Sequence, residues 1–256
     1  MTPFLAVVCA VLGLVVGSFL NVVVHRLPRH ESVVRPRSRC PGCGTQLAWR
    51  DNVPVVSWLA LRRRCRTCRR PISARYPLVE LATAALFAAA ALRFGPDAAL
   101  PAYLVLFAAI VAIAAIDLEH FIVPNRIVYP ALFASVPLLV VAAAVGDEWA
   151  SLRDAAVGGL AAWGALLVIH LASPRGMGFG DVRLAGLIGV HLGWLSLGHV
   201  VTGLFLAFAS AAVVGLGLVA ASLRTGKDRV PFGPFLALGA VAAVLFGGPL
   251  ISWYRV

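Results

Sequence analysis

The chain has 256 residues, of which 61% are hydrophobic and 13% are charged, and its mean hydropathy is +0.91. Soluble domains carry about 25% charged residues. Runs of about 20 apolar residues, each long enough to cross a bilayer as a helix, recur along the sequence. The composition therefore excludes a soluble globular domain and predicts an integral membrane protein.

The formal net charge of +11 is concentrated in one segment. Residues 26–77 contain thirteen arginines against Glu31 and Asp51, so this segment carries the whole excess. A basic segment beside membrane helices is expected to stay on the cytoplasmic side and to contact anionic lipid headgroups. Because this explanation is sufficient, we expect no nucleic-acid partner.

Eight apolar segments are predicted to form transmembrane helices. The first covers residues 4–24 and ends at His25-Arg26 rather than at a small-residue cleavage site, which favours a retained helix over a signal peptide. The other seven segments are 78–94, 100–116, 127–145, 155–172, 181–193, 196–223 and 232–252. Together they predict an all-α membrane fold with both termini outside the cytoplasm.

The loops agree with that orientation. The loop 146–154 contains three acidic residues against one arginine and is predicted to face the outside, whereas the turn 173–175 and the basic loop 224–229 are predicted to lie inside. The predicted domains are a first transmembrane helix (1–25), a cytoplasmic loop domain (26–77) and a polytopic membrane domain (78–256).

The loop domain contains two Cys-x-x-Cys pairs separated by 21 residues: Cys40-Pro-Gly-Cys43 and Cys65-Arg-Thr-Cys68. Two such pairs are typical of a zinc ribbon, in which four thiolates bind the metal. About 50 residues are too few for a stable hydrophobic core, and zinc binding contributes folding free energy. Since four thiolates leave no open position, we predict a structural zinc; redox dithiols are the alternative. Cys9, in the first helix, is interpreted as a packing residue.

Two aspartates are predicted at the cytoplasmic ends of helices and therefore at one membrane depth. Asp117 ends the third apolar segment, and Asp181 begins the sixth. Two neighbouring carboxylates share one proton, so the ionised one can activate water while the protonated one polarises a scissile carbonyl. This is the chemistry of aspartic proteolysis. The alternative roles are an interfacial charge for Asp117 and a helix N-cap for Asp181.

Three glycines precede Asp181 at alternate positions: Gly176, Gly178 and Gly180. A loop without side chains allows another backbone to approach closely. We predict that this loop binds an extended substrate as an added strand and presents its peptide bond to the carboxylates. Pro124 is predicted to end the preceding helix and to turn the chain back toward the site.

The chain resembles the type IV prepilin peptidases, a family of membrane aspartic proteases, over nearly its whole length. The matching stretches are Gly17-Ser-Phe-Leu-Asn21, Arg26-Leu-Pro28, the two Cys-x-x-Cys pairs, Asn52-Val-Pro-Val-Val-Ser-Trp-Leu59, Ile72-Ser-Ala-Arg-Tyr-Pro-Leu-Val-Glu80, Asp117-Leu-Glu119, Pro124-Asn125, Gly178-Phe-Gly-Asp181 and Pro231-Phe-Gly-Pro-Phe-Leu-Ala237. Their order and spacing agree with the family pattern.

The resemblance implies that Asp117 and Asp181 are the catalytic pair and that prepilin or pseudopilin precursors are the substrates. It implies cleavage after a glycine that ends a short basic leader, at the cytoplasmic face of the bacterial plasma membrane. It also implies methylation of the new N-terminal amine with S-adenosylmethionine, a step that many family members perform. The cysteine-bearing loop makes this chain resemble the longer, bifunctional form of the family. A peptidase without methyltransferase activity is the alternative. The residues themselves mark no donor site, since no glycine-rich dinucleotide fingerprint is present.

Two positions depart from the usual family pattern: Arg183 stands where lysine is usual, and Asn125 where aspartate is commoner. Because the charge at position 183 is retained, we expect activity to survive. Two other functions remain as alternatives. One is a transporter that moves protons or cations through the aspartates, although charges within the helices are almost absent. The other is a membrane-anchored zinc ribbon that binds nucleic acid through its arginines.

Overall fold

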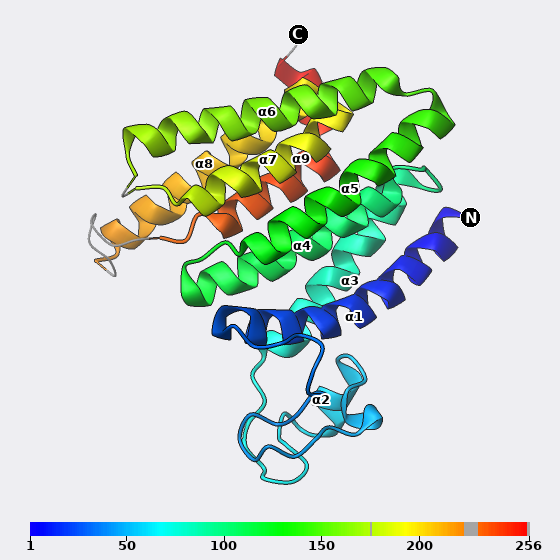
Figure 1. The fold of residues 1–256 in the computed structure, drawn as a ribbon, viewed down its shortest axis with the longest axis vertical. Helices are drawn as coiled ribbons and strands as arrows, with labels where there is room; N and C mark the ends of the chain where they lie inside the picture. The colour runs from blue at the N-terminus through cyan, green and yellow to red at the C-terminus, as the bar shows by residue number, and fades with distance from the viewer. Residues whose placement is uncertain (175, 223–229, 255–256) are drawn as a thin grey trace. The chain divides into compact units, whose positions relative to one another are not determined.

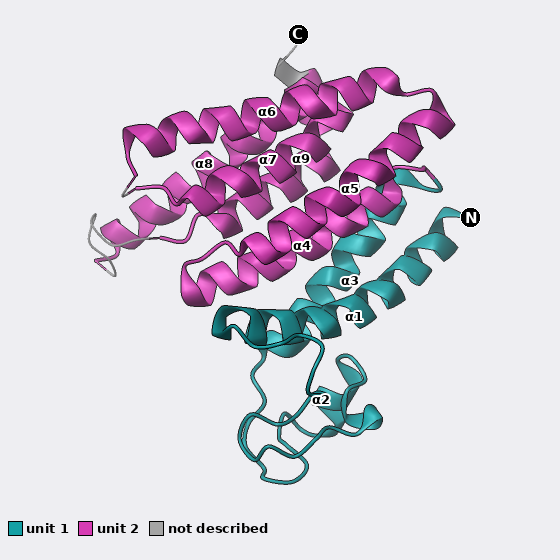
Figure 2. Ribbon diagram, viewed as in Figure 1, with its two compact units in different colours: residues 1–96 teal, residues 97–256 magenta. Residues whose placement is uncertain are grey.

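The computed structural model describes residues 1–174, 176–222 and 230–254, and all regular elements of this part are helices apart from two isolated β-bridges. The chain forms two compact units, residues 1–96 and 97–256 (Figures 1 and 2). The predicted all-α fold is confirmed. The predicted division into 1–25, 26–77 and 78–256 stays a prediction.

The first unit is built on two long helices, α1 (Thr2–Arg26) and α3 (Arg75–Phe94), which pack against each other. The close approach depends on glycines one turn apart on α1: a Cβ on Gly13 would lie 2.6 Å from the Cα of Ala84, and one on Gly17 2.7 Å from the Cα of Glu80. Small residues at this spacing let helix backbones meet in a membrane. The short helices η1 (Leu27–Arg29), η2 (Trp49–Asp51) and α2 (Val56–Ala60) lie between α1 and α3 in the sequence.

The second unit is a bundle of six helices, drawn side by side in Figure 1. They are α4 (Leu100–His120), α5 (Asn125–Gly146), α6 (Trp149–Ala172), α7 (Phe179–Leu195), α8 (Leu197–Ala220) and α9 (Gly233–Tyr254). Helix α7 is central, since it contacts every other helix of the unit. Its core position fits its sequence, because its buried residues are distributed around the whole helix.

Seven of the described helices are long and apolar enough to span a membrane. The remaining predicted span, the sixth (181–193), is α7; this helix has 17 residues, a length of about 26 Å that is at the lower limit for crossing the hydrocarbon core. The predicted loop 146–154 is wrong in length, because α6 already begins at Trp149 and only Asp147 and Glu148 separate it from α5. Arg175 of the predicted turn and the whole basic loop 224–229 lie outside the described residues.

A buried polar contact joins α4 to α7. The hydroxyl of Tyr103 donates a hydrogen bond to the carbonyl oxygen of His191 at 2.8 Å, and Nε2 of the His191 ring lies 3.2 Å from the carbonyl oxygen of Ala102. Both side chains are fully buried. Buried polar contacts of this kind fix one register between two otherwise apolar helices.

Gly13→Ala should destabilise the protein by about 1–3 kcal/mol, because the added methyl group meets the backbone of α3 and the helices must separate. Gly164→Ala is the matched control: it is also a helical glycine, but an added Cβ there meets no atom within 4 Å. It should be neutral or slightly stabilising. Thermal unfolding in detergent measures both, and equal melting temperatures for the two variants would contradict this account.

Candidate active site and cysteine cluster

Asp117 lies in the last turn of α4 and is 4% exposed. Its Oδ2 atom accepts a hydrogen bond of 2.9 Å from the backbone N–H of Gly233, the first residue of α9. The first N–H groups of a helix have no partner within the helix and stabilise negative charge. The start of α9 therefore holds the Asp117 carboxylate in place.

Asp181 occupies the third position of α7 and is 8% exposed. Its carboxylate accepts a hydrogen bond from the backbone N–H of Gly178, which precedes the helix as its N-cap residue. An acidic side chain that reaches back from the third position to the N-cap N–H is half of a capping box. Asp181 is thus held by the beginning of its own helix.

Both carboxylates line one cavity of about 270 Å³, and they are close enough for electrostatic repulsion between their charges. The remaining lining residues are Phe121, Ile122, Val123, Asn125, Gly178, Gly180 and Arg183. Because ionising both carboxylates brings like charges together, the pair favours a state that shares one proton. The cavity therefore has the two groups that water activation requires.

A side chain at either glycine would crowd the carboxylate, and more severely at Gly233 than at Gly178. A Cβ on Gly233 would lie 2.8 Å from Oδ2 of Asp117, and a Cβ on Gly178 would lie 3.3 Å from Oδ2 of Asp181. At Gly180 a Cβ would lie 2.8 Å from the Cβ of Val123, in the loop after α4. That third glycine lets the start of α7 approach the end of α4, which brings the aspartates together.

The turn before Asp181 is anchored by a residue that sequence reasoning did not select. Nδ1 of His170, on α6, lies 2.8 Å from the carbonyl oxygen of Met177, and its ring packs against Phe179. The turn Ser173–Gly176 closes with a backbone hydrogen bond of 3.0 Å. The role of Gly233 was also not predicted. Its stretch was recognised as a family motif, but the sequence does not show that its N–H binds the Asp117 carboxylate.

Pro124 is the N-cap of α5, whereas α4 ends four residues earlier at His120. Phe121 adopts a left-handed conformation (φ 56°) and donates its N–H to the carbonyl oxygen of Asp117. The prediction that Pro124 ends the helix is therefore wrong in detail, because Phe121 ends α4 and Pro124 begins α5.

The two departures from the family pattern contact each other. Nη1 of Arg183 donates a hydrogen bond of 2.6 Å to Oδ1 of Asn125, and its guanidinium lies 4.4 Å from the ring centre of Phe179. At position 183, the usual lysine would lack the planar guanidinium that stacks on the Phe179 ring. At position 125, the neutral amide oxygen of asparagine is a sufficient acceptor for the arginine N–H. Asn125 and Arg183 thus form a matched pair at the rim of the cavity.

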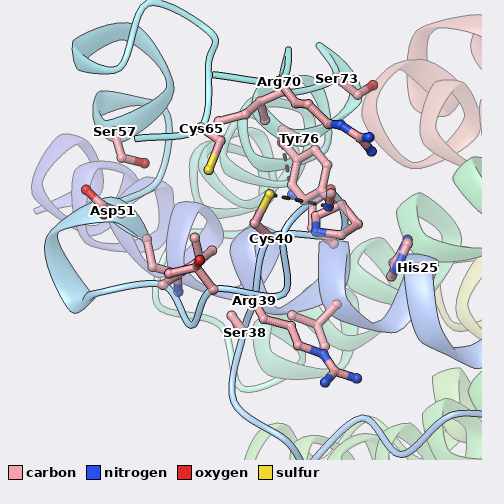
Figure 3. Close-up of a pocket in the computed structure, with 18 of the residues that line it drawn as sticks. His25, Ser38, Arg39, Cys40, Asp51, Ser57, Cys65, Arg70, Ser73 and Tyr76 are labelled. Carbon is pink, nitrogen blue, oxygen red and sulfur yellow. Dashed lines mark hydrogen bonds between the residues drawn. The ribbon is translucent and has the colours of Figure 1, made fainter. Parts of the chain in front are cut away.

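The four predicted cysteines of the first unit are brought together. Cys40, Cys43, Cys65 and Cys68 place their sulfur atoms within 4.8 Å of one another, and Sγ of Cys40 lies 3.8 Å from Sγ of Cys68. Figure 3 shows the sulfurs of Cys40 and Cys65 turned toward each other. Four thiolates around zinc at about 2.3 Å are separated by about 3.8 Å. The cluster therefore fits a tetrahedral metal ion.

The two cysteine turns have the same backbone structure. In the first turn, the N–H of Cys40 donates to the carbonyl oxygen of Thr45, and the carbonyl oxygen of Cys40 accepts from the N–H of Gly44. In the second turn, the N–H of Cys65 donates to the carbonyl oxygen of Arg70, and the carbonyl oxygen of Cys65 accepts from the N–H of Arg69. Each turn is closed by one β-bridge, Arg39–Gln46 or Arg64–Pro71. The second turn thus repeats the first at a distance of 25 residues, and each places two cysteine sulfurs in the cluster.

Polar contacts support the thiolates and the loop around them. Hydrogen bonds with the side chain and backbone of Thr45 lower the pKa of Cys43 to about 6. A backbone hydrogen bond from Arg70 lowers the pKa of Cys68, but burial and hydrogen bonds with the other three cysteines outweigh it and raise that pKa to about 11. Without a metal ion the cluster therefore keeps a thiolate at Cys43 and a thiol at Cys68 near neutral pH. Nε and Nη2 of Arg66, between the second pair of cysteines, donate to Oδ1 of Asp51 at 3.1 and 2.6 Å. This contact holds the pKa of the Asp51 carboxyl below its usual range.

Comparisons with known proteins agree with this geometry. Residues 11–94 match the model of the bacterial peptidase A24 N-terminal domain, and residues 104–220 match that of the type IV leader peptidase family. A protein of Burkholderia pseudomallei (strain 1026b) is 41% identical over 93% of this chain and 84% of its own length. The chain belongs to the type IV leader peptidase family. No solved structure gives a significant match.

Other members of the type IV leader peptidase family also match over most of this chain. A Pseudomonas aeruginosa protein is 35% identical over 98% of this chain and 94% of its own length, and one from Myxococcus xanthus is 43% identical over 88% and 66%. All three relatives are named prepilin leader peptidase/N-methyltransferase. The leader peptidase match contains Asp117 and Asp181, and the N-terminal match contains the four cysteines.

Asn125→Ala and Arg183→Ala should each lower the free energy of unfolding. The double variant should lose about 0.5–1 kcal/mol less than the sum of the two single losses, because the two side chains share one hydrogen bond. Melting temperatures in detergent give the coupling. Arg153→Ala combined with Asn125→Ala is the control pair: Arg153 bonds to Asp154 instead, so its effect should be additive. Additivity of the first pair would contradict the assigned contact.

Proposed function

We propose that this protein cleaves the short basic leader from type IV prepilin-like precursors after a glycine and then methylates the new N-terminal amine. The observation that carries the peptidase assignment is the placement of Asp117 and Asp181, 64 positions apart, in one cavity with their carboxylates held by backbone N–H groups. The family and the names of the relatives support both activities.

The proposed mechanism needs no covalent intermediate. The ionised carboxylate of the pair takes a proton from a water molecule, whose oxygen attacks the carbonyl carbon of the leader's final glycine. The protonated carboxylate donates to the carbonyl oxygen, and the amine leaves with a proton as the tetrahedral intermediate collapses. Burial of both side chains keeps bulk water from competing for these hydrogen bonds.

Gly176, Gly178 and Gly180 are proposed to bind the substrate backbone as an added strand. Exposure of Gly176 and Gly178 supports this role, and Gly178 and Gly180 line the cavity of the aspartates. An exposed loop without side chains leaves its backbone groups accessible for such pairing.

We propose zinc as the metal of the cysteine cluster, bound by Cys40, Cys43, Cys65 and Cys68 in a structural role. The four sulfur atoms use all positions of a tetrahedral ion, so the metal orders the loop rather than takes part in cleavage. The methyl donor is proposed to be S-adenosylmethionine, which supplies an electrophilic methyl group when bound. The amine nitrogen provides the electron pair, the donor sulfur keeps the pair of the broken bond, and one proton leaves the nitrogen.

The protein is a multi-pass protein of the inner membrane. We propose that the active site and the arginine-rich loop face the cytoplasm, where the loop contacts anionic lipid headgroups, and that nucleic acid is not a partner. The proposal is supported by the thirteen arginines between residues 26 and 77, since basic loops are retained on that side.

Asp117→Asn and Asp181→Asn should each reduce leader cleavage by at least about a thousandfold, because an amide can neither accept the proton of water nor donate one to the carbonyl. A purified prepilin incubated with membranes that contain each variant, followed by gel mobility of the product, measures this. Asp147→Asn, an identical change at an exposed residue between α5 and α6, should leave cleavage intact. Cleavage by either site variant would refute the assignment.

The purified protein should contain one zinc ion per chain, and Cys40→Ser or Cys65→Ser should lose it because three thiolates hold zinc much more weakly. Metal analysis by mass spectrometry measures the content. Cys9→Ser should retain the full content, since Cys9 lies in α1 apart from the cluster. Acidification should release the metal as the thiolates become protonated, and zinc retention in the Cys40 and Cys65 variants would contradict the ligand set.

A further inference from the structure

The short helix α2 and the residues before it expose large apolar side chains. Val56 and Leu59, one turn apart on α2, are 62% and 59% exposed, and Val53, just before the helix, is 36% exposed. Trp49, on η2, is 84% exposed, and η2 contacts α2. These four residues form the α2 face. Apolar side chains gathered on a surface in this way mark a site that binds a partner or a membrane.

The start of α2 lies beside α3 rather than beyond its end. The backbone N–H of Val55, the N-cap residue of α2, donates a hydrogen bond of 2.8 Å to Oε2 of Glu80 on α3. Glu80 in turn faces α1 at Gly17, where a Cβ would lie 2.7 Å from the Cα of Glu80. Gly17 precedes the end of α1 at Arg26 by nine residues, about 13 Å along the helix. Because α1 is apolar as far as Val24, the start of α2 lies at the depth of the membrane leaflet on the side of the loop.

The end of α2 lies nearer the aqueous side. Nε1 of Trp58 donates a hydrogen bond of 3.2 Å to the carbonyl oxygen of Ile72, and the N–H of Ile72 donates one of 2.7 Å to the carbonyl oxygen of Arg63. Ile72 precedes α3, which begins at Arg75, so these contacts lie where the loop joins that helix. Residues 53–64 thus run from the depth of the leaflet outward to its surface.

The charge of this segment changes along the same direction. Its apolar residues stand at the deep end, whereas Arg62, Arg63 and Arg64 follow α2 at the surface end, and all three are exposed. Trp49 is likewise followed by the exposed Arg50. In segments that lie in a bilayer surface, apolar side chains enter the acyl region, tryptophan lies at the boundary and arginines contact the anionic headgroups. The α2 face and its arginines have this order.

We propose that the α2 face inserts into the acyl region of the leaflet on the side of the loop, with the neighbouring arginines bound to anionic headgroups. The loop is joined at both ends to helices long and apolar enough to span the membrane, α1 and α3, which keeps α2 at the bilayer (Figure 2). The inference rests on the proposed headgroup contact of the arginine-rich loop and extends it to the acyl chains. Since α2 lies between the two cysteine turns in the sequence, this insertion anchors the cysteine cluster at the membrane surface.

The test adds a tryptophan inside the α2 face and, as a matched control, outside it. Val56→Trp adds an indole to the face, and Val34→Trp makes the same change at a valine that is 78% exposed. The carbonyl oxygens of Ser32 and Arg37, on either side of Val34, accept hydrogen bonds from Arg26, so Val34 lies at the end of α1, outside the acyl region. The full-length variants are reconstituted in vesicles of phosphatidylcholine and phosphatidylglycerol, with or without bromine in the acyl chains.

Bromine quenches an indole that it contacts, and subtraction of the wild-type emission isolates the added indole. Brominated lipid should lower this emission by at least about half in Val56→Trp and by less than about a tenth in Val34→Trp. Leu59→Glu combined with Val56→Trp should reduce the quenching at least about twofold, because a carboxylate enters the acyl region unfavourably. Since these side chains are exposed, all variants should melt in detergent at the wild-type temperature.

The wild-type protein gives a second measurement that needs no variant: a lipid with a photoreactive group in its acyl chain should label residues 53–59 but not residues 32–37. An unquenched indole in Val56→Trp, equal quenching in both tryptophan variants, or absence of label from residues 53–59 would overturn the inference. If the unquenched indole is shielded by added prepilin or by a higher protein density in the vesicles, the α2 face binds the substrate or a second copy, and the inference fails.

The headgroup contact is measured separately, by trypsin cleavage of the arginine-rich loop in wild-type vesicles. If phosphatidylglycerol slows this cleavage while Val56→Trp stays unquenched, only the insertion fails. If phosphatidylglycerol has no effect and the indole is unquenched, the proposed headgroup contact fails with it.

Discussion

Each buried carboxylate of the candidate site is held by a backbone N–H at the beginning of a helix, and the geometry of the site depends on this contact. Gly233 of α9 donates to Asp117, and Gly178 before α7 donates to Asp181. The partial positive charge of a helix N-terminus offsets part of the cost of burying a carboxylate in an apolar bundle. A side chain at either glycine would meet the carboxylate that it binds.

The bundle of the second unit keeps these contacts in register. Helix α7 lies among the five other helices, and the contact between Tyr103 and His191 joins it to α4 away from the aspartates. His170 holds the turn that precedes Asp181. Aspartic proteolysis requires two carboxylates at a fixed separation around one water molecule, so such positioning serves the proposed mechanism.

The first unit is stabilised in a different way. Outside α1 and α3 it has few buried apolar side chains, and its loop is organised by four cysteines and the ion pair of Asp51 with Arg66. Two turns of equal backbone structure, 25 residues apart, each present a pair of sulfur atoms. The proposed metal ion would replace the hydrophobic core that so short a segment lacks.

The sequence by itself predicted the long helices and the grouping of the four cysteines, because hydrophobic runs and cysteine spacing are local properties. It also predicted that Asp117 and Asp181 lie together, and their catalytic role stays a prediction. It did not determine where α6 begins, nor the equal structure of the cysteine turns, which share only their cysteines and the arginine before each pair. Tertiary structure alone decided the partners of the site: Gly233 lies 116 residues from Asp117, and Asn125 lies 58 from Arg183. The physical reason is that such hydrogen bonds depend on how distant helices pack, which no local pattern encodes.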